Sequence, residues 1–266
     1  MLSDSIKKEI KLKIFKRIWN LKGRFVYYGQ KVFFPKNSVI FQTAVIEGIY
    51  ESANLRIINS LIEPNTEVFD IGANIGIMAI PFLTEHNDIK VISVEASPNT
   101  LPYLKRTQTA SAYSNRWVII DKAVSDSAKT ITFNLAAEAD GAYDSMLDTK
   151  RISFTRSVEI DCTTIDRIWV ERNRPPVSFI KIDIEGGDLL ALKGGLECIQ
   201  TCRPSILLEW NHINIKAFGL VNKDFFDFFK SINYSCFAAP ELNKVTALNE
   251  LDLFSNLTEN FLLIPN

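Results

Sequence analysis

The sequence predicts an α/β protein with a Rossmann-like, mostly parallel sheet of seven strands and helices on both faces. Short β-branched and aromatic runs alternate along the chain with longer helix-like segments, which is the order expected of a parallel sheet. A small-residue turn, Gly72 to Gly76, follows the first of these runs, and an acidic residue, Glu95, ends the second. In doubly wound folds such a turn and such a carboxylate hold a nucleotide-like ligand.

The elements follow from these patterns in chain order. We expect strand 67–72, helix 75–85, strand 90–96, helix 99–112, strand 116–124, strands 131–135 and 157–162, helix 164–171, strand 178–184, helix 188–201, strand 205–210, helix 223–231, and strands 234–239 and 260–265. Ser97 would cap helix 99–112 with Pro98 in its first turn, and Pro81 would kink helix 75–85. The last two strands are separated by a mostly polar segment, 240–259, with no expected helix, which suits an antiparallel hairpin.

The turn after the first strand has the spacing D-x-G-x-N-x-G, formed by Asp70, Gly72, Asn74 and Gly76, with Ala73 between. This spacing fits S-adenosylmethionine better than the G-x-G-x-x-G pattern of dinucleotide sites. Without a Cβ, Gly72 would let the backbone approach the methionine part, and Asn74 tolerates left-handed backbone. Asp70 would accept a hydrogen bond from the ammonium group. The alternative is an ordinary strand-to-helix turn.

The next two strands extend the predicted cofactor site. Glu95, with Ala96 and Ser97 after it, ends the second strand at the position where a carboxylate bonds ribose hydroxyls. The third strand ends near Asp121 and Ala123, where an adenine ring would pack. Asp121 could bind the adenine amino group, or it could be a surface charge.

Three segments together resemble the FkbM-type methyltransferases. They are DIGANIG at 70–76, VEASP at 94–98 and KIDIEGGDLLALKGG at 181–195, and the likeness extends from about Gly48 to Asn211. The resemblance implies a class I methyltransferase fold, closed by a C-terminal antiparallel hairpin, over residues 48–266. It also implies that S-adenosylmethionine is the cofactor, S-adenosylhomocysteine the product, and a sugar or glycosylated metabolite the acceptor of the methyl group.

The candidate catalytic residues follow the fourth and fifth strands. Transfer of a methyl group to a hydroxyl needs alignment and a base, and Asp183, Glu209 and His212 are the candidates. Asp183 also lies where it could contact the cofactor. The acceptor would meet residues around the same strand ends. These are Tyr50, Glu51, Glu185 and Asn211.

A divalent metal is an alternative that we do not favour. Asp183, Glu209 and Asn211 could offer oxygen ligands to Mg²⁺. Metal-dependent catechol-type O-methyltransferases carry adjacent acidic and amide ligands on the fifth strand, whereas Trp210 separates Glu209 from Asn211 here.

The charge is unevenly distributed. Residues 1–36 hold ten Lys and Arg against two acidic residues, a balance of +8. The net charge of the chain is −1, so residues 37–266 together carry −9. Within 1–47, which we predict to be a basic helical arm, four isoleucines recur at intervals of four residues. They are Ile6, Ile10, Ile14 and Ile18, with Phe15 and Trp19 beside them. The arm could pack on the acidic remainder, cover the acceptor cleft, or bind an anionic membrane surface.

The composition argues against several classes of protein. No run of 18 uncharged apolar residues is present, the N-terminal segment lacks a signal peptide pattern, and the four cysteines form no C-x-x-C pair. We therefore expect a cytoplasmic enzyme with reduced thiols, with contact to the inner face of a membrane as an alternative, and no nucleic-acid partner. Other hypotheses are methylation of a lipid, peptide or small metabolite, and a non-catalytic binding module. The sequence leaves the oligomeric state open.

Overall fold

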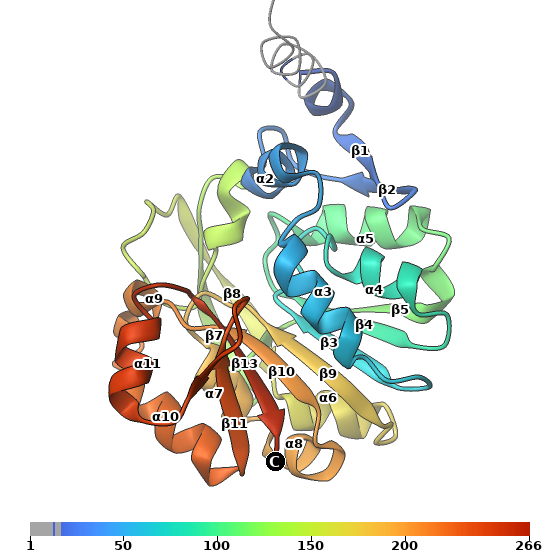
Figure 1. The fold of residues 1–266 in the computed structure, drawn as a ribbon. Helices are drawn as coiled ribbons and strands as arrows, with labels where there is room; N and C mark the ends of the chain where they lie inside the picture. The colour runs from blue at the N-terminus through green and yellow to red at the C-terminus, as the bar shows by residue number, and fades with distance from the viewer. Residues whose placement is uncertain (1–12, 14–16) are drawn as a thin grey trace, which may run out of the picture.

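The computed structural model describes residue 13 and residues 17–266 and is built around an eight-stranded sheet (Figure 1). The strand order is β12-β11-β13-β10-β9-β3-β4-β5. The strands are β3 (Glu67–Ile71), β4 (Lys90–Glu95), β5 (Trp117–Asp121), β9 (Val177–Ile182), β10 (Ser205–Glu209), β11 (Tyr234–Ala238), β12 (Asn243–Val245) and β13 (Asn260–Pro265). The strands from β10 to β5 are parallel, and β13 lies antiparallel between β10 and β11. The predicted fold class is confirmed, but the sheet has eight strands where seven were predicted, because β12 is added at its edge.

The segment before the last strand differs from the prediction. Residues 240–259 contain the edge strand β12 and a helix, α11 (Leu248–Phe254), where no helix was expected. The carboxylate of Glu250 accepts hydrogen bonds from the backbone N–H groups of Thr246 and Ala247 at the start of this helix. Leu251 is completely buried. Local capping and one buried leucine therefore form a short helix in a polar segment that shows little periodicity.

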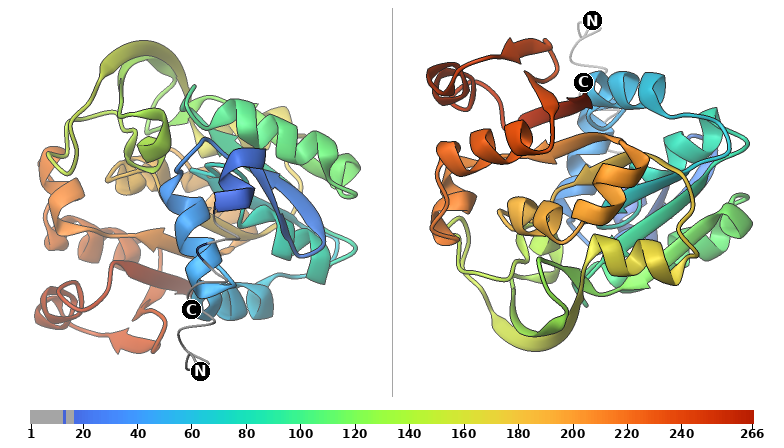
Figure 2. Two further views of the ribbon diagram at one scale, coloured as in Figure 1. Left: turned by 90° about the horizontal axis from the view of Figure 1, so that it is seen from above. Right: turned by 90° about the horizontal axis from the view of Figure 1, so that it is seen from below.

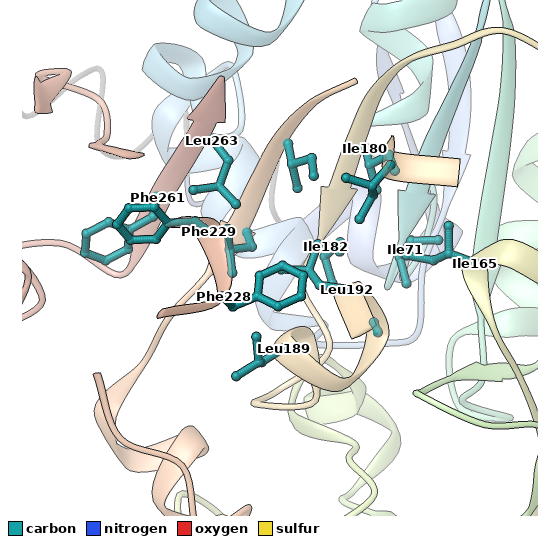
Figure 3. Close-up of a cluster of buried hydrophobic side chains, with 14 of the residues drawn as sticks. Ile71, Ile165, Ile180, Ile182, Leu189, Leu192, Phe228, Phe229, Phe261 and Leu263 are labelled. Carbon is teal, nitrogen blue, oxygen red and sulfur yellow. The ribbon is translucent and has the colours of Figure 1, made fainter. Parts of the chain in front are cut away.

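Helices cover both faces of the sheet. They are α3 (Ser52–Leu61), α4 (Ala79–Glu85), α5 (Leu101–Ala110), α6 (Ile165–Glu171), α7 (Asp188–Lys193), α8 (Leu196–Cys202), α9 (His212–Ala217) and α10 (Asn222–Ser231). Alternation along each strand separates two apolar clusters. Ile71, Ile180 and Ile182 pack with residues of α7 and α10 on one face, as Figure 3 shows, whereas Val68 and Val91 pack with α3 and α4 on the other.

Three predicted helices have different bounds. The helix expected at 75–85 begins only at Ala79, so Pro81 lies in its first turn, where a missing N–H needs no partner and no kink follows. The helix expected at 99–112 begins at Leu101 with Thr100 as its N-cap, and the Ser97 hydroxyl instead accepts from Asn99 N. The segment 188–201 forms two helices, α7 and α8, with Gly194 as the C-cap of the first and Gly195 as the N-cap of the second. Gly194 also lies so close to Ser125 that a Cβ would overlap its backbone oxygen.

The predicted third strand, 116–124, also splits in two. After β5, residues Ala123–Val124 form β6, which pairs with β8 (Arg156–Thr163) in a separate sheet of order β6-β8-β7, with β7 spanning Lys129–Leu135. A 3₁₀ segment, η2 (Glu138–Tyr143), follows β7, and a shorter one, η1, spans Ser114–Arg116. The small sheet and η2 project beyond the main sheet and form one wall of the cleft described below.

The first 47 residues are not helical throughout. Residues 17–22 are helical, and they are followed by a hairpin of β1 (Arg24–Tyr27) and β2 (Gln30–Phe33) and by helix α2 (Val39–Glu47). The hairpin packs beside α5, where Phe33 N donates to Thr107 Oγ1 at 3.0 Å (Figure 2, left). Ile6, Ile10, Ile14 and Phe15 lie outside the described residues. Among the described helices, none has the length and apolar character to cross a membrane.

Candidate active site

A cleft of about 350 Å³ lies at the carboxyl ends of the parallel strands. The turn after β3, the ends of β4 and β9, and Glu209 at the end of β10 form its floor, while α2 and the segment 141–146, which includes the end of η2, form its walls. Helix α2 and η2 contact each other. This is where doubly wound sheets place their ligands. The cleft brings together most of the predicted site residues. These are Tyr50, Glu51, Gly72, Ala73, Asn74, Glu95, Ala96, Ala123, Asp183, Glu185 and Glu209.

The turn after β3 is held in left-handed backbone on both sides of Ala73. Gly72 has φ +84° and Asn74 has φ +51°, as expected for these residue types. The N–H groups of Gly72 and Ala73 both donate to Val94 O. A Cβ on Gly72 would overlap the backbone oxygen of Asp183. The positive φ and the neighbouring strand end therefore both require a glycine at this point of the cleft wall.

Two residues of the motif do not lie on the cleft wall. Gly76 has φ +83°, and a Cβ there would lie 2.6 Å from the ring of Trp117, so this glycine serves packing. Asp70 is completely buried beneath the turn, where it accepts from Ser93 Oγ at 3.4 Å. Burial raises the pKa of Asp70 to about 6, although the nearby Lys181 ammonium lowers it. The predicted contact between Asp70 and the cofactor ammonium is therefore not supported by its position.

Glu95 lies on the wall and is fixed by backbone donors. Its Oε2 accepts from Asn74 N and its Oε1 from Ser97 N, both at 2.7 Å. Burial raises its pKa to about 7, although these two hydrogen bonds lower it. Ser97 does not line the cleft; its hydroxyl donates to Asp144 Oδ2, which ties the segment 141–146 to the end of β4. Each carboxylate oxygen of Glu95 has a second lone pair for a ligand hydroxyl.

Asp121 does not reach the cleft. Its side chain is 54% exposed and pairs with Lys105 Nζ at 2.9 Å on the surface. The predicted contact with adenine is therefore wrong for this residue, and the surface-charge alternative describes it. The neighbouring Lys122, Ala123 and Val124 line the cleft instead, because β6 leaves the main sheet at this point.

Three carboxylates meet at the other end of the cleft. Oxygen atoms of Asp183, Glu185 and Glu209 all lie within 4.8 Å of one another. Burial, followed by the charge of Asp183, raises the pKa of Glu185 to about 7 and the pKa of Glu209 well above its ordinary value. Asn214 Nδ2 donates to Glu185 Oε2 at 2.8 Å and to Glu209 Oε2 at 3.4 Å. Burial and the neighbouring charge of Asp183 therefore favour the protonated forms of Glu185 and Glu209. The three residues are called the carboxylate trio below.

Two cations flank the carboxylate trio. Lys181 Nζ lies 3.0 Å from Asp183 Oδ2 in the buried floor. Burial would lower the pKa of Lys181, but the charges of Asp183, Glu51 and Asp70 raise it. On the open side, Arg151 Nη1 lies 2.9 Å from Glu185 Oε2, and its guanidinium lies 5.1 Å from the Tyr143 ring centre.

His212 and Asn211 do not line the cleft. His212 begins α9, and its Nε2 lies 2.8 Å from Ser255 Oγ. Asn211 caps the same helix, since its Oδ1 accepts from Ile213 N at 2.8 Å. The predicted catalytic role of His212 and the predicted acceptor contact of Asn211 are not supported by these positions. Asn211 and His212 follow β10 closely and were therefore predicted to line the cleft. They lie elsewhere because α9 begins at His212, directly after the strand.

Several wall residues carried no local signal in the sequence. Arg151 comes from an irregular segment and Glu259 precedes the last strand, and both reach the cleft only through the fold. Val39, Ile40 and Thr43 reach it from α2. Lys181 could have been found, because it alternates with Asp183 along β9 and must point to the same side of the sheet.

The wall residues fit a cationic nucleoside such as S-adenosylmethionine. Acidic residues outnumber basic residues on the wall by seven to three. The acidic residues are Glu51, Glu95, Asp144, Asp183, Glu185, Glu209 and Glu259, and the basic residues are Lys122, Lys181 and Arg151. Small residues at the turn and at the end of β4 leave space, and Glu95 presents a carboxylate there. The carboxylate trio also offers the oxygen ligands that Mg²⁺ prefers, whereas Asn211 is occupied in its helix cap.

Residues 70–236 match the family described as the methyltransferase FkbM domain. The chain belongs to this family. This family is one of S-adenosylmethionine-dependent methyltransferases, and the resemblance noted in the sequence is confirmed. No match to a curated protein was found.

Solved structures share the fold of this FkbM-family chain. A putative caffeoyl-CoA O-methyltransferase from Staphylococcus aureus is 12% identical with a TM-score of 0.50, and the match covers 97% of this chain and 100% of that one. Methyltransferase FkbM from Methylobacillus flagellatus is 15% identical with a TM-score of 0.48. That match covers 97% of this chain but 60% of the Methylobacillus chain, so our chain spans about three fifths of its length.

Proposed function

We propose that this methyltransferase transfers a methyl group from S-adenosylmethionine to a hydroxyl oxygen of a sugar or glycosylated metabolite. The observation that carries the proposal is the shared cleft, in which the turn after β3 and Glu95 lie at one end and the carboxylate trio at the other. A hydroxyl acceptor must lose a proton during the transfer, and the trio places groups able to take it beside the cofactor residues.

The cofactor would be held by residues already fixed in place. When bound, S-adenosylmethionine supplies an electrophilic methyl group on a positively charged sulfur. Glu95 would accept from the ribose hydroxyls, since its carboxylate is already oriented by Asn74 N and Ser97 N. Asp183 is next to the turn, because its N–H donates to Ile71 O, and it would accept from the ammonium group in place of Asp70.

The proton of the acceptor hydroxyl would pass to the carboxylate trio. Glu209 is the strongest candidate to receive it, because its pKa is raised well above the ordinary value by burial and by Asp183 and Glu185. A carboxylate of higher pKa is a better base when ionised. Lys181 pairs with Asp183, whereas Glu209 has no lysine or arginine partner in the described part of the chain.

The residues around the carboxylate trio suit a sugar as the acceptor. Sugars bind where carboxylates and amides accept and donate many hydrogen bonds beside aromatic rings, and Tyr50, Tyr143, Glu259 and Asn260 line this end. A lipid, peptide or small metabolite with one hydroxyl is the second candidate. The apolar side chains of Val39 and Ile40, which also line the cleft, would favour it.

The test has two stages. Calorimetric titration with S-adenosylhomocysteine compares the natural protein with Glu95→Gln, and binding that weakens in the variant supports the cofactor site. Methyl transfer is then assayed on glycosides, free sugars, lipids and peptides. Transfer to glycosides supports the proposal, transfer only to the other classes overturns the sugar assignment, and binding without transfer to any class favours a binding module.

The role of Glu209 is tested in the same assay. Glu209→Gln should lower kcat by about a hundredfold or more, as expected for loss of a general base, and leave S-adenosylhomocysteine affinity within a few-fold. Glu259→Gln is the matched control, because it also lines the cleft but lies outside the carboxylate trio. Equal losses in both variants would remove Glu209 as the proton acceptor.

A further inference from the structure

The hairpin of β1 and β2 has one face that points away from the core. Phe25, Tyr27 and Val32 are buried, and the alternation of strands therefore turns Arg24, Val26 and Lys31 outward. Val26 and Lys31 are direct cross-strand partners. Among the described residues, the hairpin and the helix at 17–22 lie at the surface of this end of the molecule, in front in the view from above (Figure 2, left).

Exposed apolar side chains are concentrated in the same part of the chain. Of the twelve large hydrophobic residues exposed among those the structure describes, five lie between residues 18 and 49. They are Ile18, Leu21, Val26, Ile46 and Ile49. Leu21 is 76% exposed and Val26 is 64% exposed, so neither is part of the core. We call Ile18, Leu21, Lys22, Arg24, Val26 and Lys31 the N-terminal face.

The charge of this region is positive. Between residues 17 and 47 the chain carries five basic residues and one acidic residue, Glu47. The five are Arg17, Lys22, Arg24, Lys31 and Lys36, and the structure joins none of them by an ion pair to another described residue. The preceding sixteen residues add five lysines and two acidic residues in the sequence. A surface that combines cations with protruding aliphatic side chains matches the interface of an anionic bilayer.

We propose that the N-terminal face binds the surface of an anionic lipid bilayer peripherally. Leu21 and Val26 would enter the headgroup region, and the lysines and arginines would lie among lipid phosphates. Basic charge alone would also suit a nucleic acid. The charged backbone of a nucleic acid provides no apolar layer for an exposed leucine or valine, whereas a bilayer does. The apolar residues therefore favour the bilayer.

If the chain methylates a sugar as proposed above, the position of the N-terminal face determines from which side the acceptor reaches the cleft. Helix α2 follows the hairpin directly; Ile40 and Thr43 line the cleft, whereas Ile46 at its end is 64% exposed. The cleft wall and the N-terminal face therefore belong to one continuous segment, which would bring the acceptor end near the bilayer (Figure 1). A glycosylated acceptor carried by a lipid would reach the cleft from that side.

The experiment is co-sedimentation of the full chain with vesicles, without cofactor or acceptor. Vesicles of phosphatidylcholine alone are compared with vesicles of phosphatidylcholine mixed with phosphatidylglycerol, at low and high salt. We expect binding to the mixed vesicles only, weakened by salt. Since no methyl transfer is involved, this outcome is independent of whether the enzyme acts on sugars.

Two variants and two matched controls identify the surface. Lys31→Gln should weaken binding about fivefold, as expected for one cation, and Leu21→Asp should weaken it more. Lys216→Gln and Leu257→Asp change an exposed lysine and an equally exposed leucine elsewhere, and both should bind as the natural protein does. Absence of binding to mixed vesicles overturns the proposal. Equal loss in the controls, or DNA binding as tight as vesicle binding and insensitive to Leu21→Asp, also overturns it.

Discussion

The ammonium group of Lys181 is buried in the floor of the cleft, 3.0 Å from Asp183 Oδ2 and close to Asp70 and Glu51. Its replacement by methionine removes the positive charge that these carboxylates share. Breaking a buried pair of this kind costs about 3 to 5 kcal/mol of the free energy of unfolding. The cost should be smaller near pH 5 than near pH 7.5, because Asp70, with a pKa of about 6, is protonated at the lower pH.

Denaturant unfolding of Lys181→Met at the two pH values measures this effect. Lys105→Met is the matched control, since Lys105 also lies 2.9 Å from an aspartate oxygen but is 52% exposed. An exposed pair contributes less than about 1 kcal/mol, so the control should be nearly neutral at both pH values. A loss in Lys181→Met that does not change with pH would contradict the role given to Lys181.

Gly72→Ala should unfold the protein rather than only weaken the cofactor site. A positive φ costs a residue with a Cβ about 1 to 2 kcal/mol, and at Gly72 the added carbon would also overlap the oxygen of Asp183. Gly29→Ala separates the two causes, because Gly29 has φ +74° but no atom within 4 Å of the position of a Cβ. Chemical denaturation should show a clearly larger loss for Gly72→Ala, and equal losses would mean that the strand end moves aside.

At the scale of elements, helix α7 begins with a carboxyl group that opposes stability at high pH. Asp188 is completely buried, and burial followed by the charge of Asp183 raises its pKa to about 8. The folded chain therefore binds a proton that the unfolded chain releases near pH 4, and the free energy of unfolding falls as pH rises from about 4 to 8. Asp188→Asn has no carboxyl group at this position, so its free energy of unfolding should not fall with pH for this reason. Its free energy of unfolding relative to the natural protein should increase by more than about 1 kcal/mol between pH 5 and 8, and a constant difference would contradict the assignment.

Elements with strong periodicity were predictable, whereas elements set by tertiary contacts were not. Strand β9 and helix α10 lie close to their predicted bounds, because a run such as Phe179 to Ile182 can only be a buried strand. The break between α7 and α8 lies at Gly194, which packs against Ser125 from a distant part of the chain. The hairpin of β1 and β2 was not predicted, because the helical spacing of the isoleucines before it was extended over residues 1–47.

At the scale of the whole molecule, most cleft residues that directly follow a strand were predictable, whereas those from irregular segments were not. The motif placed Gly72, Asn74 and Glu95 correctly because a strand and its following turn are local features. The contacts predicted for Asp121 and His212 are not supported, because Asp121 points to the surface at the end of β5 and His212 lies in the first turn of α9. Arg151 and Glu259 reach the cleft from irregular segments, so only the complete fold reveals them.

The excess of acidic groups in the cleft predicts that ligand binding depends on pH. In the free protein Glu95 has a pKa of about 7, and only its ionised form is a full acceptor for ribose hydroxyls. Binding therefore favours loss of a proton, so affinity for S-adenosylhomocysteine should rise by up to tenfold per unit as pH increases from about 6 to 7 and level off above 8. Calorimetry near pH 7 in two buffers of different ionisation enthalpy should show proton release. Glu95→Gln should bind more weakly and lose most of this pH dependence; a variant that kept it would assign the proton to the carboxylate trio instead.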